Sequence, residues 1–318
     1  MDLNLPTLNP TTAEHLLHGA VLSWRQRWSV LKASGPALCD YLQGQITQDM
    51  GRLTPNRAIH SAILTPQGKA VSELYLLEAG CDEVIILTPT SCAEKSVGRL
   101  RQFALGQTLR IGIVDSLTIC SLQGANAAEI LADFGISEPD QGWLACSRTA
   151  QGDCFALVMP ENPRGYWLIG SRERLRSLMN QHPCIDESEI EAMRIIRGLP
   201  NFGVEWDESV HPLNANLIEF DGVSFDKGCY VGQEVTSRMQ WRGGIKKRLY
   251  RVAIDGEPDT LPCPVRSTAN IGVLRSAAID HDNNCTGIAL LPIEIAESDA
   301  ALSLENGTAV EILEACHA

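Results

Sequence analysis

Long hydrophobic runs are absent from this sequence of 318 residues. No apolar stretch approaches the roughly 18 to 20 residues of a membrane-spanning helix, and the N-terminus lacks the basic-then-apolar layout of a secretory signal. The hydrophobic content of 44% and the charged content of 20% are ordinary for a soluble globular protein. We therefore expect a cytoplasmic protein with no membrane partner, long enough for two or three domains.

Closely spaced cysteine pairs are also missing. The 11 cysteines are scattered, with no Cys-x-x-Cys motif, and none of the 7 histidines stands at zinc-ligand spacing from a cysteine pair. An odd number of scattered cysteines predicts reduced thiols rather than a disulfide framework. The pattern also argues against a permanent structural zinc or a self-sufficient iron–sulfur cluster. A cluster shared transiently with a partner stays open.

Positive charge is scarce, with 26 basic residues against 39 acidic ones and a net charge of −13. Because phosphate neutralisation drives non-specific nucleic-acid binding, we expect none from this chain. One segment departs from this balance. It has no acidic residue and contains Trp241 together with six basic residues, namely Arg238, Arg242, Lys246, Lys247, Arg248 and Arg251. This basic run is either a solvated strand edge or a rim for an anionic ligand, with RNA ranking below that.

Chemically reactive side chains concentrate in the octapeptide Lys227-Gly228-Cys229-Tyr230-Val231-Gly232-Gln233-Glu234. Its two glycines allow a tight turn or a close approach to a ligand. The ammonium group of Lys227 would favour the thiolate of Cys229, the form that reacts or binds metal, if that thiol is partly exposed. The alternative for Cys229 is a small buried residue that only packs.

This octapeptide resembles the signature of the YgfZ family. Members of that family are folate-binding relatives of the glycine-cleavage T-protein, and its mitochondrial members assist iron–sulfur cluster assembly. Further segments resemble family landmarks in the expected order: residues 42–45 with Thr47 and Asp49, residues 64–69, 198–200, 216–217 and 222–225, and Arg238 with residues 242–243. The resemblance covers roughly residues 20 to 250.

A strand followed by a helix occurs twice in similar form. A strand over 24–32 leads through Gly35 into a helix with Leu42, and a strand over 118–122 leads through Gly124 into a helix with Leu131. A second strand-then-helix pair, over 84–103, has its counterpart over 165–179. The order of these elements predicts two similar α+β units on antiparallel sheets.

Turn and cap residues predict the remaining elements. A turn with proline and glycine at 65–68 joins paired strands over 59–64 and 70–77, and Ser91 with Glu94 predicts a capping box for the helix that follows. A helix over 187–196 stops before Gly198-Leu199-Pro200. An irregular segment over 201–226 then leads to the signature, and short alternating strands after residue 248 predict a small β-barrel.

These elements divide the chain into a lead-in over 1–20, a first α+β unit over 21–115, a second over 116–240 that ends in the signature, and a barrel over 241–318. With the resemblance, the predicted fold is α+β, a three-domain ring of T-protein type with two ferredoxin-like units and a small C-terminal β-barrel.

The resemblance implies a reduced folate, such as tetrahydrofolate, in the central opening of the ring, and no resident metal. A pterin needs an aromatic face, a carboxylate or amide, and cations for the glutamate tail. The folate-binding candidates are Trp28, Arg194, Tyr230, Gln233, Glu234 and Arg238, and the catalytic candidates are Cys229 and Lys227. Alternative roles are open for three of the candidate sites: core packing for Trp28, an exposed helical cation for Arg194, and a mutual ion pair for Glu234 and Arg238.

Two positions depart from the T-protein pattern. Ser72-Glu73 stands where the T-protein has its catalytic acidic doublet, and Ile196 replaces its pterin-binding glutamate. We therefore expect a monomeric, folate-binding accessory protein for assembly or repair of iron–sulfur clusters, serving carrier or client proteins that include tRNA-modifying enzymes. In this hypothesis the Cys229 thiolate lies beside the folate and briefly holds a cluster or a one-carbon adduct. A folate-dependent aminomethyl or methyl transferase and a non-catalytic scaffold are the alternatives, so enzymatic activity is an open point.

Overall fold

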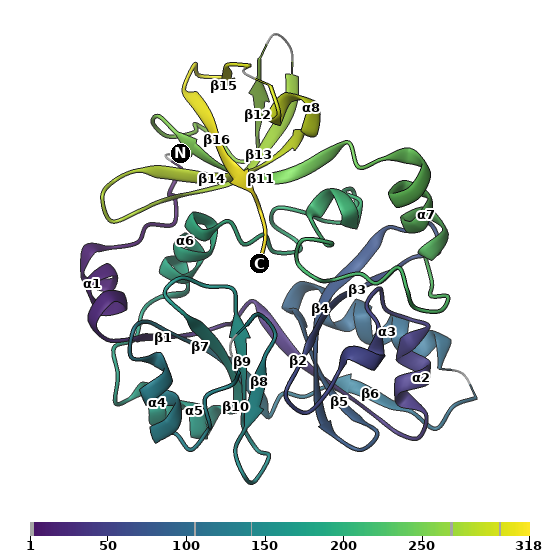
Figure 1. Cartoon of the computed structure of the whole chain (residues 1–318). Helices are drawn as coiled ribbons and strands as arrows, with labels where there is room; N and C mark the ends of the chain where they lie inside the picture. The colour runs from purple at the N-terminus through teal and green to yellow at the C-terminus, as the bar shows by residue number, and fades with distance from the viewer. Residues whose placement is uncertain (1–2, 105, 141, 268–269, 299) are drawn as a thin grey trace.

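A computed structural model describes residues 3–104, 106–140, 142–267, 270–298 and 300–318. Two five-stranded antiparallel sheets lie side by side beneath a closed six-stranded barrel, with irregular segments and the C-terminus near the centre (Figure 1). The predicted fold of two α+β units and a C-terminal barrel is confirmed. No helix of the described residues is long and apolar enough to cross a membrane.

The first sheet has the strand order β3-β4-β5-β2-β6. Its strands are β2 (Trp28–Ser34), β3 (Ile59–Leu64), β4 (Ala70–Gly80), β5 (Glu83–Pro89) and β6 (Arg110–Ile113). Helices α2 (Leu38–Gln43) and α3 (Ala93–Phe103) cover one face. There, buried Leu42, Leu74 and Leu100 share one apolar cluster.

The second sheet has the order β1-β7-β10-β9-β8. Its strands are β1 (Val21–Trp24), β7 (Leu117–Gln123), β8 (Cys146–Arg148), β9 (Phe155–Met159) and β10 (Gly165–Ser171), and its helices are α4 (Ala127–Asp133) and α5 (Arg172–Met179). The remaining faces of the two sheets share a core in which Trp28 and Tyr75 of the first meet Trp167 of the second. The sheets thus form one packed body.

The predicted repeat has a backbone basis. Gly35 after β2 and Gly124 after β7 have nearly equal φ values, +135° and +139°. A Cβ atom at Gly35 would overlap the carbonyl oxygen of Thr108, and one at Gly124 would overlap that of Gly19. Each strand therefore turns into its helix at a position that only glycine fits.

The two sheets exchange their edge strands. Strand β1 precedes β2 in the chain but pairs with β7, whereas β6 precedes β7 but pairs with β2. Two expectations are corrected. Val21–Trp24 belongs to the second sheet, whereas the sequence assigns it to the first unit. A turn separates β1 from β2, whereas the sequence predicts a single strand over 24–32. An edge strand can pair with either sheet without any change in its local pattern.

The predicted capping box at the start of α3 is wrong. A short 3₁₀ turn, η2 (Thr90–Cys92), precedes the helix, and Cys92 is the N-cap without a side-chain cap hydrogen bond. Ser91 lies inside that turn, with its Oγ 3.8 Å from the Cys92 sulfur. Ser91 therefore precedes the N-cap position by one residue, and the helix has no side-chain cap.

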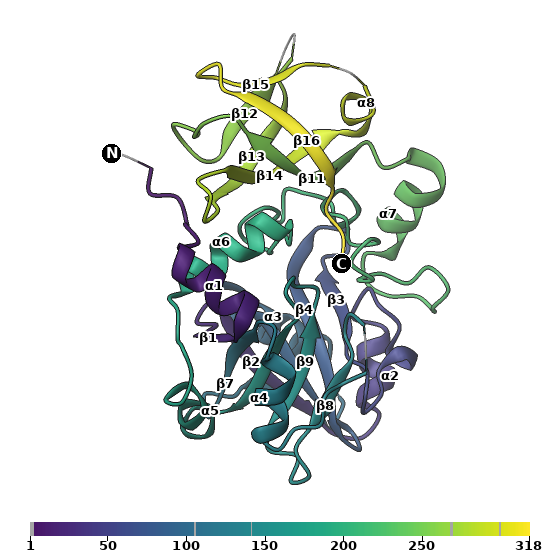
Figure 2. The ribbon, with the colours of Figure 1, turned by 60° about the vertical axis from the view of Figure 1, so that its left-hand side comes forward.

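Helix α6 (Glu187–Arg197) lies between the second sheet and the barrel (Figure 2). It ends at Gly198, whose φ of +81° is left-handed as the sequence predicts. The shorter helices outside the sheets are α1 (Pro10–His18), η1 (Met50–Arg52), η3 (Pro212–Ala215), α7 (Gln233–Arg238), the π turn η4 (Met239–Gly243) and α8 (Ile293–Ala296). The barrel consists of β11 (Lys247–Ile254), β12 (Cys263–Arg266), β13 (Asn270–Ile279), β14 (Cys285–Pro292), β15 (Leu302–Leu304) and β16 (Ala309–Ala315).

Candidate functional site

A central pocket lies where the two sheets, the end of α6 and the irregular segment after it meet. Its walls include five aromatic side chains, those of Tyr75, Trp143, Trp167, Trp206 and Phe220. Charged and polar residues also line it, namely Arg25, His60, Glu73, Glu161, Arg194 and Asn201. Aromatic walls with a few convergent polar groups are typical of a small-molecule site.

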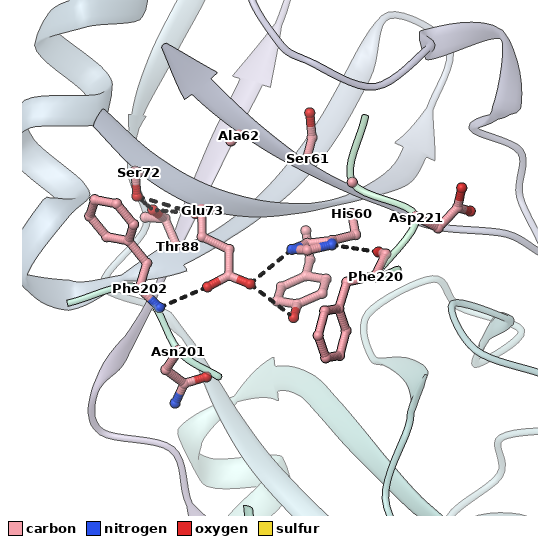
Figure 3. A network of polar contacts seen from close by, with 12 residues as sticks. His60, Ser61, Ala62, Ser72, Glu73, Thr88, Asn201, Phe202, Phe220 and Asp221 are labelled. Atoms are coloured by element: carbon pink, nitrogen blue, oxygen red, sulfur yellow. Dashed lines mark hydrogen bonds and ion pairs between the residues drawn. The ribbon is translucent and has the colours of Figure 1, made fainter. Parts of the chain in front are cut away.

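Glu73 of β4 is buried at the edge of this pocket. One of its carboxylate oxygens lies 2.8 Å from Nε2 of His60, and the other accepts a hydrogen bond of 3.0 Å from the backbone N–H of Phe202 (Figure 3). The hydroxyl oxygens of Ser72 and Thr88 lie 2.6 Å apart and 3.2 and 3.1 Å from the backbone carbonyl oxygen of Glu73, so one hydroxyl donates to that carbonyl and the other donates to its neighbour. The carboxylate therefore has a fixed position on a strand and links the first sheet to the segment after α6.

The buried side chains of His60 and Glu73 are joined by one hydrogen bond. Nδ1 of His60 lies 2.7 Å from the carbonyl oxygen of Phe220, which can only accept, so Nδ1 must carry a proton. At 2.8 Å, Nε2 and the Glu73 oxygen then share a single further proton. Both side chains are 3% exposed, so this proton is held away from bulk water.

Tyr75 lies beside this pair. Its ring stacks on His60 with centroids 4.8 Å apart, and its hydroxyl donates to Glu73 over 3.4 Å. Burial, and then the nearby charge of Glu73, raise the pKa of Tyr75 well above its usual value. The phenol therefore stays protonated and acts as a hydrogen-bond donor.

Several buried polar atoms around the pocket have no hydrogen-bond partner among the described residues. They are Nε and Nη1 of Arg25, the indole nitrogens of Trp143 and Trp167, and Oε2 of Glu161. Arg25 is only 3% exposed, and burial lowers its pKa. Although burial raises the pKa of Glu161, hydrogen bonding from the Trp167 indole lowers it, so these two groups partly satisfy each other, and the unused donors are those of Arg25 and Trp143. Because an unpaired buried polar group costs about 1–3 kcal/mol, these donors indicate a place for a polar ligand or ordered water.

Glu161 follows β9 and packs over Gly165, where any side chain would displace its carboxylate. Burial raises the pKa of Glu161 to about 7, although the charge of Arg25 acts in the opposite direction. The group therefore changes charge near neutral pH. A carboxylate with this property can accept from, or donate to, a ligand.

Arg194 reaches the pocket wall but is held by a buried ion network. Its guanidinium donates to Glu191 at 2.8 Å, to Glu205 at 3.0 Å and to the carbonyl of Leu199 at 2.6 Å. Burial alone would lower the pKa of Arg194, but the two carboxylates raise it above the usual value. Burial likewise opposes the charge on Glu191, yet Arg194 brings the pKa of that carboxyl down to about 2. The exposed-cation alternative for Arg194 is thus wrong.

The signature octapeptide lies elsewhere. The buried ammonium of Lys227 donates to the carbonyls of Ile46 and Gln48 at 2.9 and 2.7 Å, and it lies 5.1 Å from the centroid of the Tyr230 ring. Burial lowers the pKa of Lys227 to about 8. Its donors are thus directed at backbone carbonyls, where they hold the loop to the segment after α2.

Of the two signature glycines, Gly232 serves close packing, whereas a Cβ atom at Gly228 would meet nothing within 4 Å. A Cβ atom at Gly232, whose φ is +88°, would come within 2.7 Å of the carbonyl oxygen of Thr65, and one at Gly68 within 2.8 Å of Val235. The N–H of Val231 also donates to the carbonyl of Gly44. Three sequence landmarks, around residues 44, 66 and 230, therefore form one packed unit in the folded chain.

Cys229 is exposed on this loop and is not among the residues that line the central pocket. The interpretation of Cys229 as a buried packing residue is therefore wrong. Tyr230 is buried and has no partner for its hydroxyl among the described residues, and burial raises its pKa to about 12. Gln233 begins α7, and Glu234 pairs with Arg238 at 2.7 Å on the surface. The Glu234–Arg238 ion pair is the alternative that the sequence left open.

The predicted site residues thus fall into two places. Trp28 and Arg194 lie at the centre, where Trp28 packs behind the pocket with its ring centroid 4.8 Å from that of Trp167. The other six lie on the signature loop and α7. The groups not singled out from the sequence are Arg25, His60, Tyr75, Trp143, Glu161 and Trp167, and Glu73 entered only as a departure from the T-protein pattern. They come from separate loops and strands, so no local motif announces them. Among the described residues, no group of three or more metal-ligating side chains is placed to hold a metal ion.

Comparisons with known proteins support the family resemblance. No family model matches the chain. The "tRNA-modifying protein YgfZ" of Hamiltonella defensa is 26% identical over 274 residues, which is 84% of this chain and 77% of that protein. The protein of the same name from Pectobacterium carotovorum is 28% identical over 240 residues, covering 74% and 70% of the two chains.

The fold has a solved counterpart. The crystal structure of the glycine cleavage system aminomethyltransferase T of Bartonella henselae superposes with a TM-score of 0.84 at 16% identity, covering 99% of this chain and 90% of that one. The comparisons therefore confirm the similarity to YgfZ proteins that the signature predicts, on the fold of the glycine-cleavage T-protein.

Proposed function

We propose that the protein binds a reduced folate in the central pocket and, in this state, supports tRNA modification by way of iron–sulfur enzymes. The observation that carries folate binding is the pair of unpartnered buried donor groups, on Arg25 and Trp143, between aromatic walls. The link to tRNA modification rests on the similarity to proteins named for that process.

The pocket residues have the chemistry that a pterin needs, but the free volume between the walls is about 30 Å³, so binding would require the walls to move apart. A flat heterocycle can stack on the rings of Trp143, Trp167 or Tyr75. Its ring oxygen and nitrogens accept hydrogen bonds that the free donors of Arg25 and Trp143 can make, and its amino group can donate to Glu161. Such pairing would remove the desolvation cost of these buried groups. Tetrahydrofolate would supply a carrier for a one-carbon unit, and the residues of this chain hold and orient it.

Cys229 has a separate role in this proposal. The thiol is exposed on a loop fixed by Lys227, away from the pocket-lining residues, so we place its transient contact with a cluster or adduct on the outer surface. The partners would be iron–sulfur carrier or client proteins that reach this surface. Neither a membrane partner nor non-specific nucleic-acid binding is part of the proposal, and the protein acts as a monomer in the cytoplasm.

A folate-dependent one-carbon transferase is the second candidate. It is favoured by the buried pair of His60 and Glu73, which holds one proton at the edge of the pocket and could exchange it with a substrate amine. A single turnover that yields methylenetetrahydrofolate from an aminomethyl donor, lost in Glu73→Gln, would establish this activity. Absence of turnover with folate bound would exclude it for that donor.

The first experiment is calorimetric titration of the purified protein with tetrahydrofolate. We expect saturable binding with Kd in the micromolar range and at least tenfold weaker binding by Glu161→Gln and by Arg25→Met, because each removes a pocket partner worth about 1.4 kcal/mol or more. Cys229→Ala should bind folate as the unchanged protein does.

Cells whose own YgfZ is deleted provide the second readout. Cys229→Ala should keep folate binding and lose support of iron–sulfur-dependent tRNA modification. Wild-type-like binding by both pocket variants would contradict the assignment of the central pocket. Full support by Cys229→Ala would contradict the role of the thiol.

A further inference from the structure

A basic surface with an exposed tryptophan lies beyond the signature, at the outer edge of the molecule between α7 and β11 (Figure 1). We call it the Trp241 patch and define it by Arg238, Trp241, Arg242, Lys246 and Lys247. All five residues are exposed, and Trp241 is 71% exposed, the largest value among the exposed large hydrophobic side chains identified in the described residues.

Ion pairs divide the basic run seen in the sequence. Arg248 pairs with Glu219 at 2.8 Å and Arg251 with Glu314 at 2.9 Å, so these two serve the barrel. Arg238 pairs only with exposed Glu234. In the described parts of the chain, Arg242, Lys246 and Lys247 have no ion-pair partner. Their charges therefore remain available on a protein whose net charge is −13.

The backbone presents the tryptophan. Residues Met239–Gly243 form a π turn directly after α7, and Gly244 follows with a φ of +66°. The Trp241 and Phe225 rings lie with centroids 6.1 Å apart and their planes at 73°. Single π turns occur frequently at functional sites. The turn therefore keeps the Trp241 indole in solvent among cations, where exposure of its apolar surface to water is unfavourable.

We infer that the Trp241 patch is a docking surface for single-stranded RNA. Aromatic faces that stack bases, with cations that follow the phosphate backbone, are the combination by which proteins bind single strands. An acidic protein segment would use the cations but would not need a flat, solvent-facing indole between them. The acidic remainder of the chain confines such binding to this patch, so the inference departs from the sequence-based expectation of no non-specific nucleic-acid binding at this one place.

The patch is connected to the exposed thiol through the chain segment at Phe225. The ring centroid of Phe225 lies 6.1 Å from that of Trp241, and Phe225 stands four residues before Cys229 in the sequence. An RNA strand on the patch would therefore lie beside the surface where the proposed function places the client enzyme. The inference itself does not require folate binding.

The test is fluorescence anisotropy with a labelled 12-nucleotide oligouridine at 50 and 150 mM KCl. We expect Trp241→Ala to weaken binding about tenfold, because one stacked base contributes about 1–3 kcal/mol, and Trp241→Phe to retain most of it. Lys246→Glu with Lys247→Glu should weaken binding and lower the slope of log K against log salt by about 1.4.

A matched charge control is available. Arg110→Glu with Arg176→Glu makes the same charge change at exposed positions in β6 and α5 and should leave RNA binding nearly unchanged. Thermal unfolding and the tetrahydrofolate titration, both unaltered in Trp241→Ala, show that the fold and the pocket are intact. If the unchanged protein binds RNA but does not bind tetrahydrofolate, only the proposed function is contradicted.

Three outcomes would overturn the inference. One is equal weakening by the patch variant and the control variant. Another is binding of a 12-base-pair RNA duplex as strong as that of the single strand, since a duplex offers no free bases to stack. The third is Trp241-dependent binding of poly-glutamate with none of RNA, which would assign the patch to an acidic protein.

Discussion

His60 and Glu73 form a buried bridge, with Nε2 of the histidine 2.8 Å from Oε1 of the glutamate. The same histidine contacts the carbonyl of Phe220, and the same carboxylate accepts from the N–H of Phe202. One pair of side chains therefore holds strands β3 and β4 to both ends of the irregular segment that lines the pocket. The bridge should therefore contribute to the stability of the fold.

Removal of the histidine should cost more stability than neutralisation of the acid. His60→Ala leaves a buried carboxylate and a buried carbonyl without partners, so we expect a loss of about 3 kcal/mol in the free energy of unfolding. Glu73→Gln keeps the shape, and its amide can donate to a neutral imidazole, so we expect a loss of about 1 kcal/mol. Urea denaturation at pH 7 measures both, and equal losses would contradict the shared-proton description.

Glu161 should make stability depend on pH. Its pKa is about 7 in the folded protein against 4.5 for the free side chain. Between these values the folded state binds a proton that the unfolded state releases, so this group lowers stability as pH rises from about 4.5 to 7. Glu161→Gln removes the effect. As pH rises from 5 to 7.5, the free energy of unfolding of the variant should therefore rise by on the order of 2 kcal/mol relative to that of the unchanged protein. A difference that stays constant across this pH range would argue against a raised pKa.

The two strand-to-helix glycines should be equally intolerant of alanine. Gly35→Ala and Gly124→Ala each place a methyl group against a carbonyl oxygen at a φ near +135°, and we expect each to cost about 3 kcal/mol. Gly98 is the control, because it lies inside α3 with no atom within 4 Å of a new Cβ. Gly98→Ala should stabilise by about 0.5–1 kcal/mol. Thermal unfolding followed by circular dichroism compares the three.

Thiol labelling should report the exposure of the signature loop. Four cysteines are exposed, namely Cys39, Cys81, Cys184 and Cys229. Burial raises the pKa of Cys39 and of Cys184, which slows their reaction. At pH 8 we expect Cys229 in the fast class of native-state labelling, and Cys229→Ala should remove one fast equivalent. Labelling of Cys229 only upon denaturation would show that the loop is buried in solution.

The sequence by itself determined the elements that local physics controls. Changes in chain direction could be predicted at three glycines, Gly35, Gly124 and Gly198, because their positive φ values disfavour other residues. These glycines mark the repeated strand–helix order and the end of α6. The alternating pattern after residue 248 likewise predicted the barrel. The order of residues in the signature octapeptide predicted the similarity to YgfZ proteins. The capping box failed because a single 3₁₀ turn shifts the position of a hydroxyl, a change that spacing cannot reveal.

Only the tertiary structure decided which side chains meet. The pairing of β1 with β7 is invisible locally, since an edge strand has the same alternation in either sheet. The pocket joins Arg25, Glu73 and Glu161 from segments far apart in the chain, and the unpaired donors that mark it as a site exist only when burial removes water from them. Lys227 looked like the activator of a neighbouring thiol, but the fold gives its donors to two backbone carbonyls, because a buried ammonium must satisfy its hydrogen bonds with whatever oxygen lies closest.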